Sequence, residues 1–351
     1  MQMDFVAAFT SGLFHLGSYA AANALTSLVP IFLLAGAIVV FPRNSGIFRY
    51  FTAAVPRRVS YPVALFSGAF LCVFSLVIIP MFAALHRRGA AVGPQIVFLY
   101  AGSALNLVAV AGLASVFGAG TAIVFVVCAG GVAVLAAWIL SFLFQAHTTP
   151  LTFLRQSTPG PAEQTEWGVP VLFLLLILML FAGTIPVPFA GKMAAVLLAG
   201  TAVALYARRF FSSGGISEWM YFSGHIAVRA VPFLLLGHFL LGVFTSLIPP
   251  EMLVPYLSDN SLVSCAAGSL SGIILHVPAA LDVPVLESTF GYQTGDIAAG
   301  PMVSLLLSGS GICLPLLMVV HIVIGTRRTM VYGAVILVLA ALFGFLYGMT
   351  G

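Results

Sequence analysis

Apolar runs of about twenty residues recur along almost the whole chain, and few charged residues interrupt them. A helix of about 20 residues spans the hydrocarbon core of a lipid bilayer, which is about 30 Å thick. Charged residues make up only 6% of the 351 residues and hydrophobic residues 61%, whereas a soluble domain carries about 25% charge. A disordered chain is excluded too, because disorder needs low hydrophobicity and high charge. The sequence therefore predicts a polytopic helical membrane protein.

Most of the apolar runs are uninterrupted, but two are not. The uninterrupted spans run near 19–42, 94–118, 120–144, 168–186, 189–207, 230–249, 300–325 and 329–350. Proline, glycine and polar residues interrupt the segments 60–86 and 262–290, although both are long enough to cross a bilayer. Broken helices at matching places in two halves of a chain are the best sequence indication of a transport site. The residues before the first span, 1–18, are expected to form an amphipathic lead-in.

The two halves of the chain resemble each other in sequence. The stretch GPQIVFLYAGSALNL from Gly93 aligns without gaps on GPMVSLLLSGSGICL from Gly300, and Asn106 then stands opposite Cys313. Further pairs in the same order are Pro80 with Pro284, Gly118 with Gly325, and the segments that start at Val29 and Val231. Three such matches in one order indicate an internal repeat rather than chance similarity between apolar segments.

The arginines predict how the repeats cross the membrane. If 60–86 and 262–290 each enter and leave on one face, all 12 arginines fall on one side, and Lys192 is the exception. The positive-inside rule identifies that side as the cytoplasm. The spans 19–42 and 230–249 then run in opposite directions, so the repeats are inverted. We therefore expect an all-α polytopic protein with a first repeat at 19–145, a linker with two spans at 146–215 and a second repeat at 216–351.

Polar side chains expected at mid-membrane depth are the candidate substrate-binding residues, because inverted repeats bring them together near the midplane. They are Cys72, Ser75, Ser103, Asn106, His276, Ser308, Ser310 and Cys313. Ionisable residues are costly inside a membrane, so Asp282 and Glu287 are candidates for proton coupling. A simpler interpretation stays open for each: the thiols can serve packing alone, and Asp282, two residues before a proline, can cap a half-helix.

A transported metal species is a further expectation from the same set of side chains. Cysteine and histidine are ligands that soft metals prefer. We therefore predict that Cys72, His276 and Cys313 contact a thiophilic cargo, rather than a resident metal ion.

Motifs of membrane enzymes and of nucleotide-driven pumps are not found in the sequence. There is no HExxH metal site and no GxxxxGK[ST] loop, since Gly191-Lys192 is followed by Met193. An intramembrane aspartyl protease needs two aspartates, and Asp282 is the only plausible one. No run of Lys or Arg exceeds two residues, which argues against nucleic acid as a partner. We expect neither enzymatic activity nor a cofactor.

The segment SLVIIPMFAALHRRGAAVGPQIVFLYAGSALN, from Ser75 to Asn106, resembles the hallmark of a bacterial permease superfamily. That superfamily includes the organoarsenical efflux permease and the YraQ-type permeases. Its Pro-Leu-Phe, its Arg-Arg-Gly turn and its Gly-Pro have counterparts here at Pro80, Arg87 and Gly93. Ser75 and Val77 stand where the organoarsenical permeases have a cysteine pair, and Ser103 replaces a proline. The resemblance implies a permease, and it does not carry arsenic over as the substrate.

Together these features predict a multi-pass permease of the bacterial inner membrane that exports a small thiophilic or organometal(loid) compound by proton exchange. Proton exchange is inferred because neither a nucleotide-binding domain nor a sodium-site signature is present. The expected partners are a small-molecule substrate, the lipid bilayer and, as a further candidate, a soluble thiol carrier. Two alternatives stay open: a passive channel for small sulfur- or metal-containing solutes, and a membrane scaffold that docks a thiol-transfer partner on the Arg-rich loop 43–58.

Overall fold

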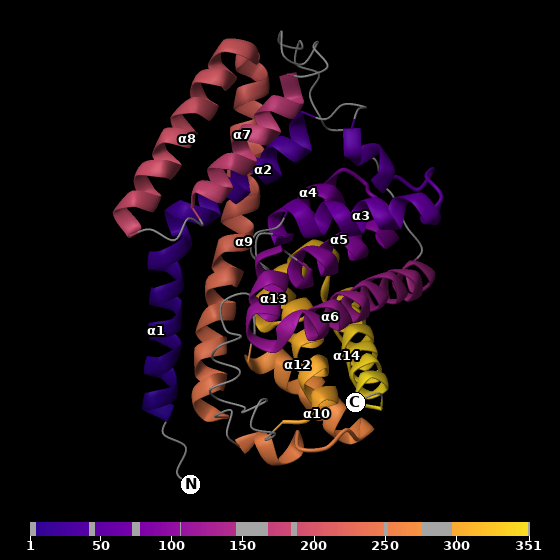
Figure 1. The fold of residues 1–351 in the computed structure, drawn as a ribbon. Helices are drawn as coiled ribbons and strands as arrows, with labels where there is room; N and C mark the ends of the chain where they lie inside the picture. The colour runs from indigo at the N-terminus through magenta and orange to yellow at the C-terminus, as the bar shows by residue number, and fades with distance from the viewer. Residues whose placement is uncertain are drawn as a thin grey trace.

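The computed structural model describes residues 5–41, 46–71, 78–105, 107–144, 168–183, 188–248, 252–275 and 297–349. Within these ranges every regular element is a helix (Figure 1). The α-helices are α1 (Phe5–Asn23), α2 (Val29–Val40), α3 (Arg57–Leu71), α4 (Ile78–Arg87), α5 (Val92–Ala104), α6 (Leu107–Leu143), α7 (Gly168–Ala182), α8 (Phe189–Phe210), α9 (Ser213–Leu247), α10 (Leu262–Leu275), α12 (Ala299–Gly311), α13 (Leu314–Ile324) and α14 (Thr326–Gly348). The predicted all-α class is confirmed.

Several of these helices are long and apolar enough to cross a membrane. Four qualify singly among the described residues: Phe117–Leu143, Phe189–Phe210, Ser213–Leu247 and Thr326–Gly348. Two bent pairs also qualify: α1 with α2, bent by 47°, and α12 with α13, bent by 44°. The prediction of a polytopic membrane protein is therefore supported by helix length and composition.

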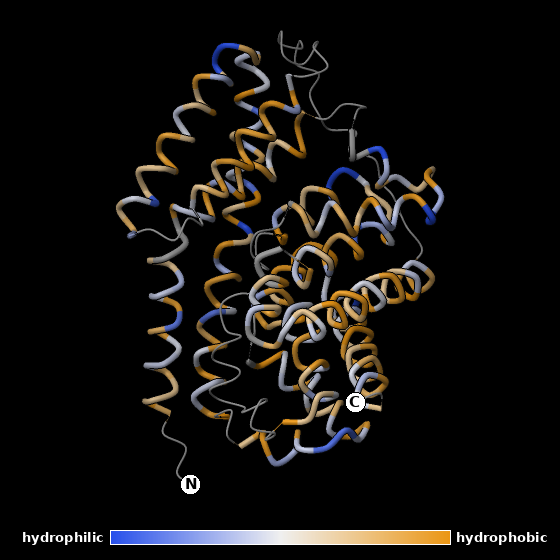
Figure 2. Tube along the Cα trace, viewed as in Figure 1, coloured by the Kyte–Doolittle hydropathy of each residue, from blue (hydrophilic) through white to orange (hydrophobic). Residues whose placement is uncertain are grey.

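Hydrophilic residues gather at two opposite ends of the molecule. Figure 2 shows them at the α8–α9 junction and the start of α3 at one end, and between α9 and α10 at the other. Helix α9 connects these ends, because its 35 residues span about 52 Å at about 1.5 Å per residue. Arg208 and Arg209 precede α9, and Asp259 follows it. We call the end with these arginines the arginine face.

Helix α3 begins at the arginine face, and helix α4 ends there. Tyr61 lies near the start of α3 and Ser141 near the end of α6. Their hydroxyl oxygens are 3.1 Å apart. The guanidinium group of Arg328 lies over the ring of Phe144, just beyond α6. His86 at the end of α4 is also near Arg328. The start of α3 and the end of α4 thus lie near the same neighbours, the end of α6 and the start of α14.

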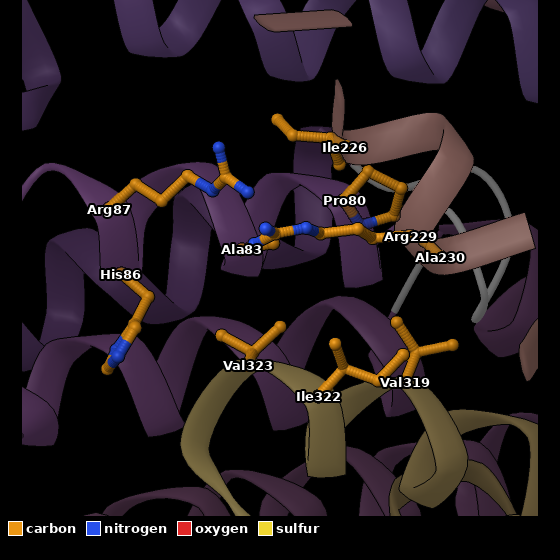
Figure 3. A pocket seen from close by; sticks show the side chains of 10 residues that line it. All are labelled: Pro80, Ala83, His86, Arg87, Ile226, Arg229, Ala230, Val319, Ile322 and Val323. Atoms are coloured by element: carbon orange, nitrogen blue, oxygen red, sulfur yellow. The ribbon is translucent and has the colours of Figure 1, made fainter. Parts of the chain in front are cut away.

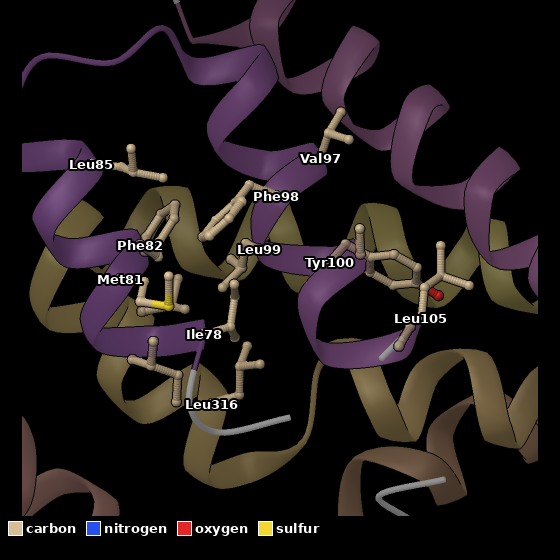
Figure 4. Packing of buried hydrophobic residues seen from close by; sticks show 14 of the residues in the cluster. Ile78, Met81, Phe82, Leu85, Val97, Phe98, Leu99, Tyr100, Leu105 and Leu316 are labelled. Atoms are coloured by element: carbon tan, nitrogen blue, oxygen red, sulfur yellow. The ribbon is translucent and has the colours of Figure 1, made fainter. Parts of the chain in front are cut away.

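Two central helices, α5 and α12, are buried on every side. Every residue of α5 from Gly93 to Ala104, and of α12 from Gly300 to Gly311, is buried. Helices that are apolar all round belong in the core of a helical assembly. Figure 4 shows Phe98 and Leu99 of α5 on the side of Phe82 and Met81 of α4, whereas Tyr100 points away from α4. The two helices also contact each other, so they form the centre of the described fold.

The two central helices end at aligned positions. Helix α5 ends at Ala104 and α12 at Gly311, which the alignment from Gly93 and Gly300 pairs. The next residue closes each helix: the amide of Leu105 bonds to Ala101 over 2.7 Å, and that of Ile312 to Ser308 over 2.8 Å. A new helix starts two residues later in both cases, at Leu107 and at Leu314.

A second repeated feature lies further along both segments. Gly118 has φ +85° and ψ 159°, and Gly325 has φ +85° and ψ 160°. This conformation is essentially restricted to glycine. The pair that the alignment identified in sequence therefore has the same backbone geometry in the structure.

Helices α5 and α12 run in opposite directions. Gln95 in the first turn of α5 lies beside His86 at the arginine face, with 3.1 Å between Oε1 and Nδ1. In the first turn of α12, the amide of Gly300 donates to Oδ1 of Asn260 over 2.9 Å. Asn260 follows Asp259 at the opposite end of the molecule. The central helices therefore start at opposite faces and meet in the middle.

Close backbone approach also repeats on the flanks of the centre. A Cβ atom at Gly68 of α3 would lie 2.8 Å from the carbonyl oxygen of Phe98 in α5. A Cβ atom at Gly272 of α10 would lie 2.6 Å from the amide nitrogen of Gly309 in α12 and would overlap Ser308. Small residues allow membrane helices to pack at this distance. The pairs α3–α5 and α10–α12 are thus held by equivalent contacts.

Helix α9 begins at Ser213, much earlier than the apolar span 230–249 suggests. Its polar first half is helical because it packs on α2. Trp219 donates through Nε1 to the carbonyl oxygen of Leu33 over 2.7 Å, and Ser223 lies against Gly36. As a result Arg229, expected in a loop before the span, lies inside a helix.

Helices α7 and α8 form a pair at the edge of the molecule (Figure 1). Most of α8 is exposed, and its buried residues are Val196, Val203 and Ala207. The pair contributes little to the central crossing.

Candidate functional site

The candidate site is the place where α5 and α12 cross. The hydroxyl group of Tyr100 on α5 donates to the carbonyl oxygen of Leu307 on α12 over 2.8 Å. Tyr332 on α14 donates to the carbonyl oxygen of Gly311 over 2.7 Å. The last carbonyls of a helix have no partner within it, so Tyr332 satisfies one that the break in α12 leaves open. Both tyrosines are fully buried.

Three of the predicted substrate-binding serines lie next to the breaks. Ser103, Ser308 and Ser310 are all fully buried. Each hydroxyl group donates to a carbonyl oxygen of the preceding helical turn: Ser103 to Tyr100 over 2.9 Å, Ser308 to Leu305 over 3.2 Å, and Ser310 to Leu306 over 2.8 Å. Ser103 and Ser310 occupy aligned positions. Such local bonds satisfy each hydroxyl group within its own helix.

Cys313 is the N-cap residue of α13 and is fully buried. It lies near Tyr19 of α1 and Tyr332 of α14. The first amides of α13 carry the partial positive charge of a helix N-terminus. A thiol and two serine hydroxyl groups are therefore gathered at the break between α12 and α13.

The other predicted site residues lie outside the described residues. These are Cys72, Ser75, Asn106, His276, Asp282 and Glu287. Of the predicted cargo-binding set of Cys72, His276 and Cys313, the structure thus places Cys313 alone. Within the described ranges no group of three or more His, Cys, Asp or Glu side chains could hold a metal ion.

A cavity of 150 Å³ lies between α4, α9 and α13. Arg87 of α4 and Arg229 of α9 extend into it from two sides, and His86 lies at its edge (Figure 3). Burial lowers the pKa of Arg87, and the nearby Arg229 lowers it further. In the sequence both arginines served only as markers of topology. An arginine just before a long apolar run was the signal that could have found this cavity, since charges at membrane depth are usually functional.

The neighbouring Arg88 has a structural role instead. Its Nε and a terminal guanidinium nitrogen donate to the carbonyl oxygen of Val39 over 3.0 and 2.7 Å. A cation at the last turn of α2 also complements the helix dipole. Burial lowers the pKa of Arg88 to about 10. The two adjacent arginines thus have different roles: Arg88 holds the end of α2, and Arg87 faces the cavity.

Comparison with known proteins identifies the family. A family described as predicted permeases matches residues 10–349, which is nearly the whole chain. The chain belongs to this permease family. It is also 25% identical over 342 residues to the UPF0718 protein MJ0584 of Methanocaldococcus jannaschii, covering 94% of this chain and 93% of that protein. No solved structure matches the chain.

The permease is therefore a multi-pass membrane transport protein, and the family block found by sequence has a clear place in its fold. Residues from Pro80 to Ser103 form α4, a tight turn and α5. Gly89 in that turn has φ +72°, which favours glycine. The turn holds Arg87 and Arg88 at the arginine face, and Gly93 starts the buried helix that leads to the crossing.

Proposed function

We propose that the permease carries a small solute through the crossing of α5 and α12, with residues 19–145 and 216–351 as inverted repeats and 146–215 as their linker. One observation carries this proposal: two fully buried helices run in opposite directions and break at aligned positions. Many transporters bind their substrates at such discontinuous helices. The shared backbone geometry of Gly118 and Gly325 supports the repeat.

Each repeat is proposed to contain a hairpin that enters and leaves the membrane on one face. For 60–86 this is supported by the start of α3 and the end of α4, which share the arginine face. For 262–290 the close packing of α10 on α12 at Gly272, equivalent to that of Gly68 on α5, supports the same plan. The tips of both hairpins, 72–77 and 276–296, lie outside the described residues.

The proposed cargo is a small thiophilic or organometal(loid) compound. Cys313 supports this because it is buried at the helix break, where a cargo would be held. Thiolate is a ligand that soft metals prefer. Cys72 and His276 are proposed as its partners in cargo binding. Export through a bacterial inner membrane, with a soluble thiol carrier delivering the cargo, completes the proposal.

Proton exchange is the proposed driving force, with Asp282 and Glu287 as the carriers. A charge at the bilayer centre costs roughly 2.5–3.5 kcal/mol on insertion scales. A carboxyl group there can take up and release one proton as its surroundings change. Asp282 follows α10 in the sequence, within the predicted segment 262–290, and α10 packs on the broken helix α12.

Two experiments test the proposal in sequence. A sensitive bacterial host that expresses the permease is first challenged separately with arsenicals, mercurials and selenium compounds, which selects the cargo. Reconstituted permease is then expected to concentrate that cargo under an imposed pH gradient. Asp282→Asn should abolish this accumulation while counterflow without a pH gradient persists, and Asp259→Asn, at the outer end of α9, should change neither.

Specific outcomes would contradict parts of the proposal. Accumulation at the wild-type rate by the Asp282→Asn variant would rule out its role in coupling and favour a passive facilitator. Protection against none of the compounds, together with no counterflow, would rule out a soft cargo.

A further inference from the structure

Further basic residues lie around the cavity between α4, α9 and α13, beside its two arginines. His225 of α9 lies near both Arg87 and Arg229, and Arg328 of α14 lies near His86. Basic residues from three helices thus lie near one another around this cavity. The rest of the cavity wall is apolar and consists of Pro80, Ala83, Ile226, Ala230, Val319, Ile322 and Val323.

Acidic groups within the described residues lie elsewhere. Asp259 is at the far end of α9, and its carboxylate accepts hydrogen bonds from Ser261 and Ser264. Glu218 is on α9 itself, eleven residues before Arg229, which is about 16 Å along the helix axis. Among the side chains that the structure describes, the charged groups beside the cavity are therefore all basic.

Arg87 is half-buried and Arg229 is exposed, and two guanidinium groups that face one cavity repel each other. Both extend toward its middle (Figure 3). A guanidinium group offers paired donors that match the oxygens of a carboxylate or an oxyanion. An anion between Arg87 and Arg229 would therefore offset the repulsion and gain charge-assisted hydrogen bonds.

The volume of the cavity limits the size of that anion. Its 150 Å³ corresponds to about five water molecules at about 30 Å³ each. This fits a tetrahedral oxyanion or a short carboxylate, with the apolar wall free to accept a small organic group.

The cavity also lies along the proposed route. Its wall comes from α4 of the first repeat and from α9 and α13 of the second. Helix α13 starts at the break beside Cys313 and reaches the cavity at Val319–Val323, about 8 to 14 Å further along its axis. A solute held between the arginines would thus be one short helix away from the crossing.

We propose that Arg87 and Arg229 form the first binding station for a small anionic cargo that carries a carboxylate or oxyanion group. This inference rests on the transport function proposed above and adds the charge class of the cargo. A soft cargo would satisfy both proposals as an oxyanion of a metalloid or as a thiol complex that bears a carboxylate.

The test measures anion binding directly on the full-length permease in phosphatidylcholine nanodiscs. Chloride is the probe, and its NMR line broadens when the ion exchanges with a binding site. The wild-type permease should broaden the line, and inorganic phosphate, sulfate or acetate should reverse the effect by competition. Arg87→Gln and Arg229→Gln should each lose most of the competable broadening.

Two control variants keep the result interpretable. Arg229→Lys preserves the charge and should retain most of the binding, which a misfolded variant would not. Arg208→Gln removes an arginine at the α8–α9 junction, outside the cavity, and should match the wild type. Unchanged broadening in Arg87→Gln and Arg229→Gln, or equal loss in Arg208→Gln, would overturn the proposal.

A lipid headgroup offers the same phosphate chemistry, so the measurement is repeated in nanodiscs that contain phosphatidylglycerol. Persistence of the chloride signal is expected for a site that serves a free solute. Loss of the signal would assign the site to lipid and overturn the inference about cargo. The binding measurement does not depend on transport. An anion site without counterflow would count against the proposed function alone. Counterflow without an anion site would count against this inference alone.

Discussion

The hydroxyl group of Tyr100 donates a hydrogen bond over 2.8 Å to the backbone carbonyl oxygen of Leu307. These residues are counterparts in the alignment that pairs Gly93 with Gly300. The bond therefore joins aligned positions of two helices that run in opposite directions, and the proposed inverted repeat would place it at a local two-fold axis. It lies within two turns of both helix breaks, so it fixes the geometry of the place where a solute is proposed to cross.

Replacing Tyr100 by Phe removes this bond and leaves the ring in place. Removal of a buried hydrogen bond typically costs about 1–3 kcal/mol when the remaining partner is left unsatisfied. Ser310 lies 3.4 Å from the same carbonyl oxygen and offsets part of the loss, so we expect the lower end of that range. A thermal unfolding assay in detergent should show a reduced Tm. Tyr256→Phe is the control, because Tyr256 is exposed; equal shifts in both variants would deny the crossing bond any special role.

Alanine at Gly118 or at Gly325 should destabilise the permease to a similar extent. Both positions have φ +85°, a region that costs a residue with a Cβ atom about 1–3 kcal/mol. A Cβ atom added at either glycine would meet no other atom within 4 Å, so backbone strain is the sole expected cause. Gly120→Ala is the matched control, because it is helical and equally open. A thermal unfolding assay in detergent checks this, and loss of stability at only one of the two glycines would argue against equivalent roles in the repeats.

The proposed topology can be tested by labelling single cysteines introduced into a cysteine-free permease in whole cells and inverted vesicles. A membrane-impermeant maleimide should reach positions 57, 87 and 327 from the cytoplasmic side and position 259 from the outside. The physical reason is the shared arginine face at the start of α3, the end of α4 and the start of α14. Labelling of positions 57 and 87 from opposite sides would exclude both the hairpin and the inverted repeat.

The cysteines are expected to differ in their effect on transport. Cys313→Ser should impair transport of a thiophilic cargo, because Cys313 lies at the helix break, and the same is predicted for Cys72→Ser. Cys128→Ser should be nearly silent, because Cys128 lies within the continuous part of α6. Transport rates in proteoliposomes, compared at equal protein content, check this. Small and equal effects at every position would leave the thiols as packing groups.

The sequence alone predicted the family, the helical class and the aligned positions of the two central helices. The alignment succeeded because Gly-Pro starts and small-residue patches are local features: they determine where a helix begins and how closely another helix can approach. The pairing of Gly118 with Gly325 could be predicted for the same reason, since a backbone conformation restricted to glycine requires glycine at both positions.

Other parts of the fold could not be predicted from the sequence. The first half of α9 is polar enough to suggest a loop, and it is helical because Trp219 and Ser223 pack on α2. Arg229 was therefore assigned to a loop and its contribution to the cavity was missed. The hydrogen-bond partner of Tyr100 could not be predicted either, because every residue has a backbone carbonyl and the sequence does not show which one accepts the bond.

The sequence by itself thus determined that this protein lies in a membrane, that it is helical, and where its central helices are interrupted. Each depends on hydrophobicity or backbone preference over a short stretch of chain. The tertiary structure alone decided which interruptions meet and which charges face one another. Those relationships arise from packing between helices far apart in the chain, such as α4 with α13 and α5 with α12. The distance that brings Arg87 to Arg229, or Tyr100 to Leu307, is a property of the assembled bundle.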